Sequence, residues 1–76
     1  MYTRIRNLRE DADLLQRDMA RILNCTQACY SRYERGVRDI PTDVLICIAR
    51  YYRTSTDYLL GLTDVRGAYP RSRQQR

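Results

Sequence analysis

The 76-residue chain contains no histidine, so it lacks the residue that most often acts as a general base and most often binds a metal. Lysine is also absent, so the 14 basic residues are all arginine. No apolar run approaches the ~18 residues that span a bilayer, and the N-terminus has no apolar segment typical of a signal peptide. We therefore expect a cytoplasmic protein that has no membrane partner and is not an enzyme.

The length predicts one small domain. A domain of this size buries only about 60% of the surface that its unfolded chain exposes, which leaves no room for a deep catalytic cavity beside the core. The content of 43% hydrophobic and 30% charged residues is typical of a folded globular protein. We expect a compact domain that holds no cofactor.

The net charge of +5 is unevenly distributed. Four arginines follow Asp64, where there is no acid, and the remaining ten arginines are offset by nine acids. Most of the excess positive charge therefore belongs to a basic, flexible tail predicted over residues 65–76, rather than to the domain predicted over residues 1–64. A nucleic-acid function would require a local cluster of arginines within the domain.

Three cysteines are present, at positions 25, 29 and 47. An odd number without a secretion signal argues against a disulfide framework, and three cysteines without histidine do not complete a four-ligand zinc site. We interpret them as small buried hydrophobic residues. The alternative is a redox-sensitive thiol at Cys29, in the first turn of a helix whose dipole favours a thiolate.

Apolar periodicity predicts helices throughout, and no stretch alternates strictly enough to predict a strand. The first helical segment repeats apolar residues at spacings of three and four: Ile5, Leu8, Ala12 and Leu15. The second, predicted over residues 16–23 with Asp18 in its first turn, has an apolar face formed by Met19, Ala20, Ile22 and Leu23.

Cap residues mark the other helices. Asn24 suits a left-handed helix stop, and Thr26 is a natural N-cap for a third helix that carries Tyr30 and Tyr33 and ends at Gly36. Pro41 and Asp43 open a fourth helix, and a short fifth begins after Ser55 and stops at Gly61. The apolar stripe of the fourth is Val44, Leu45, Ile48, Ala49 and Tyr52. The prediction is an all-α unit of five short helices.

The second and third helices have the spacing of a helix-turn-helix. Counting from Gln16, a small residue follows at Ala20 and a turn former at Asn24. Five further positions are apolar as the pattern requires: Met19, Leu23, Cys25, Tyr30 and Tyr33. An ordinary helical hairpin with the same packing needs is the alternative.

Together with the motifs RIRNLRED, SRYERG, RDIPTDVLICIA and DYLLG-x-TD, this pattern resembles the lambda-repressor and Cro-like helix-turn-helix regulators over residues 3–64. The resemblance implies a compact five-helix DNA-binding domain. The chain departs from the family at Leu15, where Ser or Thr normally caps the second helix. It also departs at Asn24, where Gly is commoner, at Tyr30, where a branched aliphatic is usual, and at Thr42, normally apolar.

The resemblance places the third helix in the DNA major groove, with Gln27, Ala28 and Arg32 reading bases. Their chemistry agrees, because Gln bonds adenine, Arg bonds guanine and the Ala methyl contacts the thymine methyl. It also assigns a partly buried ion pair to Arg9 and Glu34. The expected phosphate contacts are Gln16, Thr26, Arg35 and Arg38.

We therefore predict a regulator, in this family most often a repressor, that binds double-stranded DNA at a palindromic site as a homodimer. The predicted dimer surface includes the fourth and fifth helices, around residues 58–62, although Tyr58 and Leu59 could equally belong to the core. The alternative is an antitoxin-like or adaptor module whose main ligand is a protein partner. A nuclease or hydrolase is disfavoured because the acids are scattered over helix faces, and a solvated face explains Asp11 and Asp13 better than a metal site does.

Overall fold

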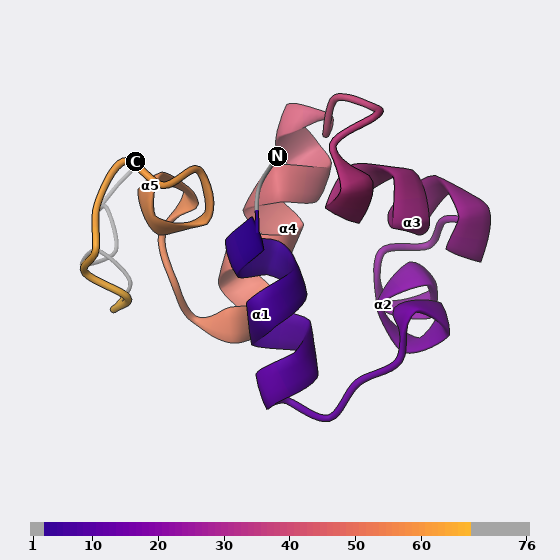
Figure 1. The fold of residues 1–76 in the computed structure, drawn as a ribbon, viewed down its shortest axis with the longest axis horizontal. Coiled ribbons are helices and arrows are strands. Elements are labelled where there is room, and N and C mark those ends of the chain that lie inside the picture. The colour runs from indigo at the N-terminus through magenta and orange to yellow at the C-terminus, as the bar shows by residue number, and fades with distance from the viewer. Residues whose placement is uncertain (1–2, 68–76) are drawn as a thin grey trace, which may run out of the picture.

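The computed structural model describes residues 3–67, and within them it contains helices but no strand. The five helices are α1 (Thr3–Asp11), α2 (Gln16–Ile22), α3 (Gln27–Arg35), α4 (Thr42–Tyr52) and α5 (Thr56–Leu59). Figure 1 shows α2 and α3 together at one end of the molecule and α5 at the other, with α1 and α4 between them. The all-α prediction is confirmed for this part of the chain. Of the predicted tail, residues 68–76 lie outside the described residues.

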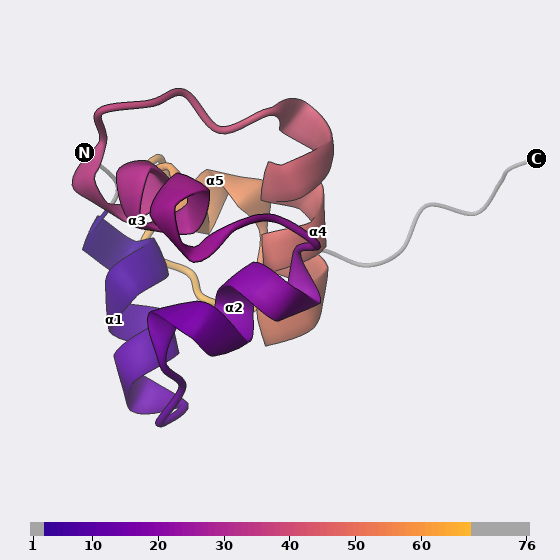
Figure 2. The same cartoon turned by 90° about the vertical axis from the view of Figure 1, so that its right-hand side faces the viewer.

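The core lies where the five helices converge. Each helix supplies one fully buried side chain, and these are Ile5, Met19, Tyr30, Ile48 and Leu59. Seen after a quarter turn, α4 runs along the right side of the molecule, while α1 and α3 lie to its left (Figure 2). Burial of this apolar surface is the main stabilising contribution in so small a domain.

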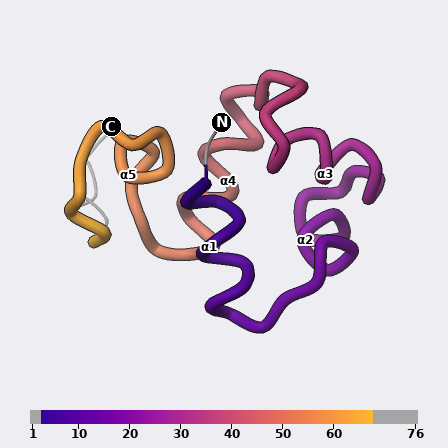
Figure 3. Tube along the Cα trace, in the orientation of Figure 1, coloured from indigo at the N-terminus to yellow at the C-terminus, as the bar shows by residue number. Residues whose placement is uncertain are grey.

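The connection between α2 and α3 follows the local sequence signals, and Figure 3 shows how short it is. Asn24 has a φ of 57°, the left-handed conformation predicted for it. The Thr26 side chain accepts a hydrogen bond from the Cys29 N–H at 3.1 Å and so caps α3. Gly36 ends α3 with a φ of 74°. Local capping chemistry thus fixes where α3 begins and ends.

Leu15 precedes α2 without a side-chain cap, as predicted from its departure from the family pattern. The Asp18 carboxylate compensates by accepting a hydrogen bond from the Leu15 N–H at 2.8 Å. The helix ends one residue earlier than predicted, and Ile22 is 37% exposed rather than part of the core.

The apolar period predicted for the first segment is wrong beyond Leu8. Helix α1 ends at Asp11, so Ala12 is exposed and Leu15 is 53% exposed. Asp13 has a φ of 58°, and Leu14 packs half-buried against the core in place of Leu15. Asp is one of the few residues that tolerate this backbone conformation, which allows the chain to turn.

The predicted openings of the last two helices are confirmed. Pro41 precedes α4, and Asp43 lies in its first turn. The Ser55 side chain caps α5 by accepting a hydrogen bond from the Tyr58 N–H at 3.0 Å. One feature had no sequence signal: Arg53, which ends α4, is left-handed with a φ of 55°.

Part of the predicted dimer surface belongs to the core. Leu59 is only 1% exposed, so it packs inside the domain. Tyr58 is half-buried, and the guanidinium carbon of Arg4 lies 4.2 Å from the centre of its ring. Leu62, at 73% exposed, is the apolar side chain of this segment that faces solvent most openly.

Arg4 ties α1 to the segment around and after α5. Its guanidinium donates to the Tyr58 carbonyl at 3.0 Å and to the Thr63 carbonyl. It also pairs with the Asp64 carboxylate at 2.6 Å, although that carboxylate is almost fully exposed. These contacts join the two outermost family motifs, RIRNLRED and DYLLG-x-TD.

We expect Arg4→Ala to lower the free energy of unfolding by about 2 kcal/mol, because charge-assisted hydrogen bonds to carbonyls are lost together with the stacking on Tyr58. Arg6→Ala, on the same helix, removes only an exposed pair with Glu10 and should cost less than about 0.5 kcal/mol. Urea denaturation of both variants measures the difference. Equal stabilities would contradict the role assigned to Arg4.

Candidate nucleic-acid interface

The outer side of α3 borders a shallow hollow of about 420 Å³, which we call the α3 groove. It is lined by one residue from the start of α2 and five from α3, namely Gln16, Gln27, Ala28, Ser31, Arg32 and Arg35. The structure therefore brings the three predicted base readers together on one surface, and all three are exposed.

This surface faces outward because the opposite side of α3 packs in the core. Tyr30 and Tyr33 are buried there, so residues on the other face of the helix must point to solvent. Sequence reasoning missed Ser31, which is half-buried in the α3 groove. Its spacing of four residues from both Gln27 and Arg35 is the signal that places it on their face.

The predicted phosphate contacts are spread around the α3 groove. Gln16 and Arg35 line it, whereas Thr26 is exposed at the start of α3 and Arg38 is exposed after its end. Because the Thr26 oxygen accepts from the Cys29 N–H, its own hydroxyl hydrogen is still available as a donor.

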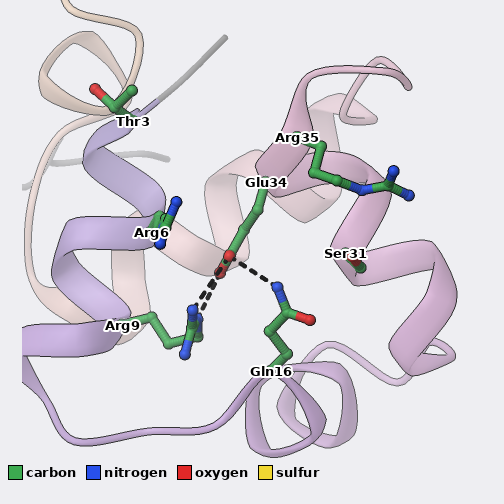
Figure 4. Close-up of a pocket in the computed structure, with 7 residues that line it drawn as sticks. All are labelled: Thr3, Arg6, Arg9, Gln16, Ser31, Glu34 and Arg35. Atoms are coloured by element: carbon green, nitrogen blue, oxygen red, sulfur yellow. Dashed lines mark hydrogen bonds and ion pairs between the residues drawn. The ribbon is translucent and has the colours of Figure 1, made fainter.

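The ion pair of Arg9 and Glu34 joins α1 to α3 (Figure 4). Arg9 donates from Nε to Glu34 Oε2 at 2.6 Å and from Nη2 to Oε1 at 3.3 Å, and its Nη1 donates to the Leu14 carbonyl at 2.8 Å. The two side chains are only 12% and 3% exposed. Glu34 therefore presents no free negative charge to the surface.

Glu34 also orients a predicted phosphate contact. Gln16 Nε2 donates to Glu34 Oε1 at 3.1 Å, which fixes the amide at the beginning of α2. Burial by itself would raise the pKa of the Glu34 carboxyl, but the hydrogen bonds from Arg9 and Gln16 and the charge of Arg9 outweigh it and hold that pKa below its ordinary value. Glu34 is thus ionised and fully engaged at neutral pH.

Two tyrosine hydroxyls are buried beside this pair. Burial first, and the nearby Glu34 carboxylate second, raise the pKa of the Tyr30 phenol, although its oxygen makes no hydrogen bond of normal geometry within residues 3–67. Burial, together with Tyr51, also raises the pKa of Tyr52 to about 12. Both phenols are therefore held neutral inside the fold.

A phenol whose pKa is raised by folding stabilises the folded state fully below its unfolded pKa of about 10, and this stability is lost as the pH rises toward 12. We expect Tyr52→Phe to change stability at pH 7 by less than about 1 kcal/mol, because the buried hydroxyl has no hydrogen-bond partner among the described residues. The variant should lose less stability than the wild type between pH 10 and 12. Thermal melts across that range test this, and parallel pH profiles would contradict it.

The cysteines pack in two environments. Cys25 and Cys29 are half-buried against the core, whereas Cys47 is exposed on α4. Burial raises the pKa of the Cys25 thiol, and the neighbouring Cys29 adds to the effect. A raised pKa reduces the fraction of Cys25 that is present as the reactive thiolate.

No group of three or more metal-ligating side chains converges within residues 3–67. In the same part of the chain, each helix is too short or too polar to cross a membrane. The geometry instead offers an exposed helix face with hydrogen-bond donors, arginines and a methyl group side by side.

Residues 5–59 match the family described as helix-turn-helix, and the chain belongs to this family. Over 62 residues it is 40% identical to the HTH-type transcriptional regulator ImmR of Bacillus subtilis (strain 168), a match that covers 82% of this chain and 49% of that protein. Over 61 residues it is 38% identical to the uncharacterized HTH-type transcriptional regulator YobD of the same organism, covering 80% of this chain and 54% of the relative.

The chain thus spans about half the length of the curated relatives it matches. No solved structure matches it. The all-α architecture with a helix-turn-helix formed by α2 and α3 agrees with the family match.

Proposed function

We propose that this protein is a transcriptional regulator that binds double-stranded DNA in a sequence-dependent manner through α3. The observation that carries the proposal is the α3 groove, along which Gln27, Ala28 and Arg32 are exposed in a row on a helix whose other face is buried. A helix of this kind fits the major groove, where its side chains reach base edges. The regulators to which the chain is similar support the same function.

In this proposal Gln16, Thr26, Arg35 and Arg38 contact backbone phosphates and set the register of α3 on the duplex. Such contacts provide affinity with little sequence preference. We also propose a cytoplasmic location, because a DNA-binding regulator must be in the same compartment as the DNA that it binds.

One domain reads only a few base pairs, so we further propose a homodimer on a palindromic site with half-sites about 34 Å apart. Leu62 and Val65, at 73% and 64% exposed, are apolar side chains available for such a contact. The bound dimer would repress by blocking polymerase access, without catalysing a reaction.

Selection of bound sequences from a random duplex pool tests the proposal. We expect an enriched motif with two-fold symmetry, bound with an affinity that falls steeply as salt increases. If no duplex is retained at low ionic strength, the assignment to DNA is wrong. An enriched motif without symmetry would retain DNA binding but reject the homodimer on a palindrome.

A further inference from the structure

A second hollow, which we call the α1 hollow, lies on the other side of Gln16 from the α3 groove. It measures about 350 Å³ and is lined by residues of α1, of the α2 start and of α3, namely Thr3, Arg6, Arg9, Gln16, Ser31, Glu34 and Arg35. None of the DNA contacts proposed above uses Thr3 or Arg6. In Figure 4 Arg6 lies on the α1 side of this hollow, whereas Arg35 lies on the α3 side and its guanidinium points away from Arg6.

The α1 hollow and the α3 groove share a wall. Gln16, Ser31 and Arg35 line both of them. The two hollows are therefore adjacent, and a DNA strand that contacts Gln16 in the proposed complex would lie beside both of them.

The charges around the α1 hollow favour an anion. Its acid, Glu34, is neutralised by Arg9 at 2.6 Å and is 3% exposed. This pairing leaves the charges of Arg6 and Arg35 without a compensating acid in the lining. Positive charges on both the α1 and the α3 side of the hollow therefore favour an anion there.

Arg6 is free to change partner. It pairs with Glu10 at 3.3 Å, one helical turn away, and both side chains are at least half exposed. An exposed pair of this kind contributes little to stability, so a phosphate can replace Glu10 at small cost. The volume of the α1 hollow corresponds to about twelve water molecules at ~30 Å³ each, which is enough for a phosphate group and its remaining hydration.

We propose that the α1 hollow binds a backbone phosphate of the DNA strand that runs past Gln16, with Arg6 as its principal charged contact and the Thr3 hydroxyl as a further donor. The inference rests on the proposed function and extends the interface from α2 and α3 onto α1. Arg6 adds affinity without sequence preference, because a phosphate carries no base identity.

The test compares Arg6→Gln with Arg50→Gln in the full chain. Arg50 is exposed on α4, lines neither hollow and carries the same charge. Dissociation constants are measured for a selected and an unrelated duplex between 50 and 200 mM salt. We expect Arg6→Gln to weaken both complexes several-fold and to reduce the slope of log K against log salt by about 0.9, the value of one phosphate contact. Arg50→Gln should leave the slope unchanged.

The outcomes separate this inference from the function on which it depends. If the wild type binds no duplex, both are overturned. If the wild type binds and the two variants show equal slopes, only the α1 hollow assignment is overturned. Thermal melts of Arg6→Gln should match the wild type, which excludes a folding defect as the cause.

A titration with inorganic phosphate, followed by NMR of the arginine Nε–H groups, distinguishes the source of the phosphate. Shifts confined to residues around the α1 hollow, without any change of salt slope in Arg6→Gln, would indicate a site for a free anion and would overturn the DNA contact. Binding of an acidic protein, but not of duplex DNA, at the α1 hollow would also overturn the proposed DNA contact.

Discussion

The Glu34→Ala variant should lose about 3–5 kcal/mol of unfolding free energy, because the nearly buried Arg9 guanidinium keeps its charge but loses its carboxylate. This is a large part of the 5–15 kcal/mol that stabilises a typical domain. DNA affinity should fall second, since Gln16 loses the acceptor that orients its amide. Urea denaturation at pH 7 gives the stability, and binding is then measured at a temperature where the variant is folded.

Glu10→Ala is the matched control. It also removes one acid, but from an exposed pair with Arg6, and should change stability by less than about 0.5 kcal/mol. A Glu34→Ala protein as stable as the wild type would rule out a structural role for the ion pair.

The pH dependence provides a second measurement. Because folding lowers the pKa of Glu34, its contribution is complete above the ordinary carboxyl pKa of about 4.3 and is lost as the pH falls through the lowered value. Glu34→Gln should therefore show a shallower loss of stability on acidification than the wild type. Superimposable acid profiles would contradict this.

The Arg32→Ala variant should bind its selected site about 1–3 kcal/mol more weakly, or roughly 5- to 150-fold, if Arg32 pairs with a guanine. Preference at one base pair of each half-site should relax, while binding to unrelated duplex should change much less. The side chain is exposed in the α3 groove, so folding should not be affected. A repeat of the sequence selection with the variant measures the loss of preference.

Arg35→Ala is the matched control on the same helix. In our proposal Arg35 contacts phosphate, so its removal should weaken all duplexes alike and reduce the salt slope by about one. If Arg32→Ala behaves like Arg35→Ala, with uniform weakening and an unchanged motif, Arg32 does not read a base.

The elements that sequence predicts best are those with their own capping chemistry. Asn24, Thr26 and Gly36 each satisfy a local backbone requirement, so the limits of α3 follow from nearby residues alone. The end of α1 cannot be predicted from nearby residues alone, because the adjacent Leu14 and Leu15 carry the same apolar side chain and either could continue the apolar pattern. The left-handed turn at Asp13 decides between them, because it is Leu14 that packs against the core after this turn.

The candidate site likewise has one part that the sequence predicts and one part that it does not. The common face of Gln27, Ala28 and Arg32 follows from helical spacing together with the position of the buried Tyr30. The hydrogen bond from Gln16 to Glu34 joins residues on two helices and depends on how these helices pack. Sequence alone thus identifies the face of α3, whereas the organisation of the residues beside it requires the three-dimensional structure.

The contacts of Arg4 have a consequence for how the domain opens. They bridge separations of 54 to 60 residues, whereas chain ends ordinarily fray independently of each other. If α1 detaches, the segment around Thr63 loses its hydrogen bonds from Arg4, and this segment has exposed Leu62 and Val65 on either side and little apolar burial of its own. The two extremities of the described chain are therefore coupled, so that opening of the first helix should increase solvent exchange in the last stretch, which then keeps the hydrogen bond from Thr54 to the Arg66 carbonyl.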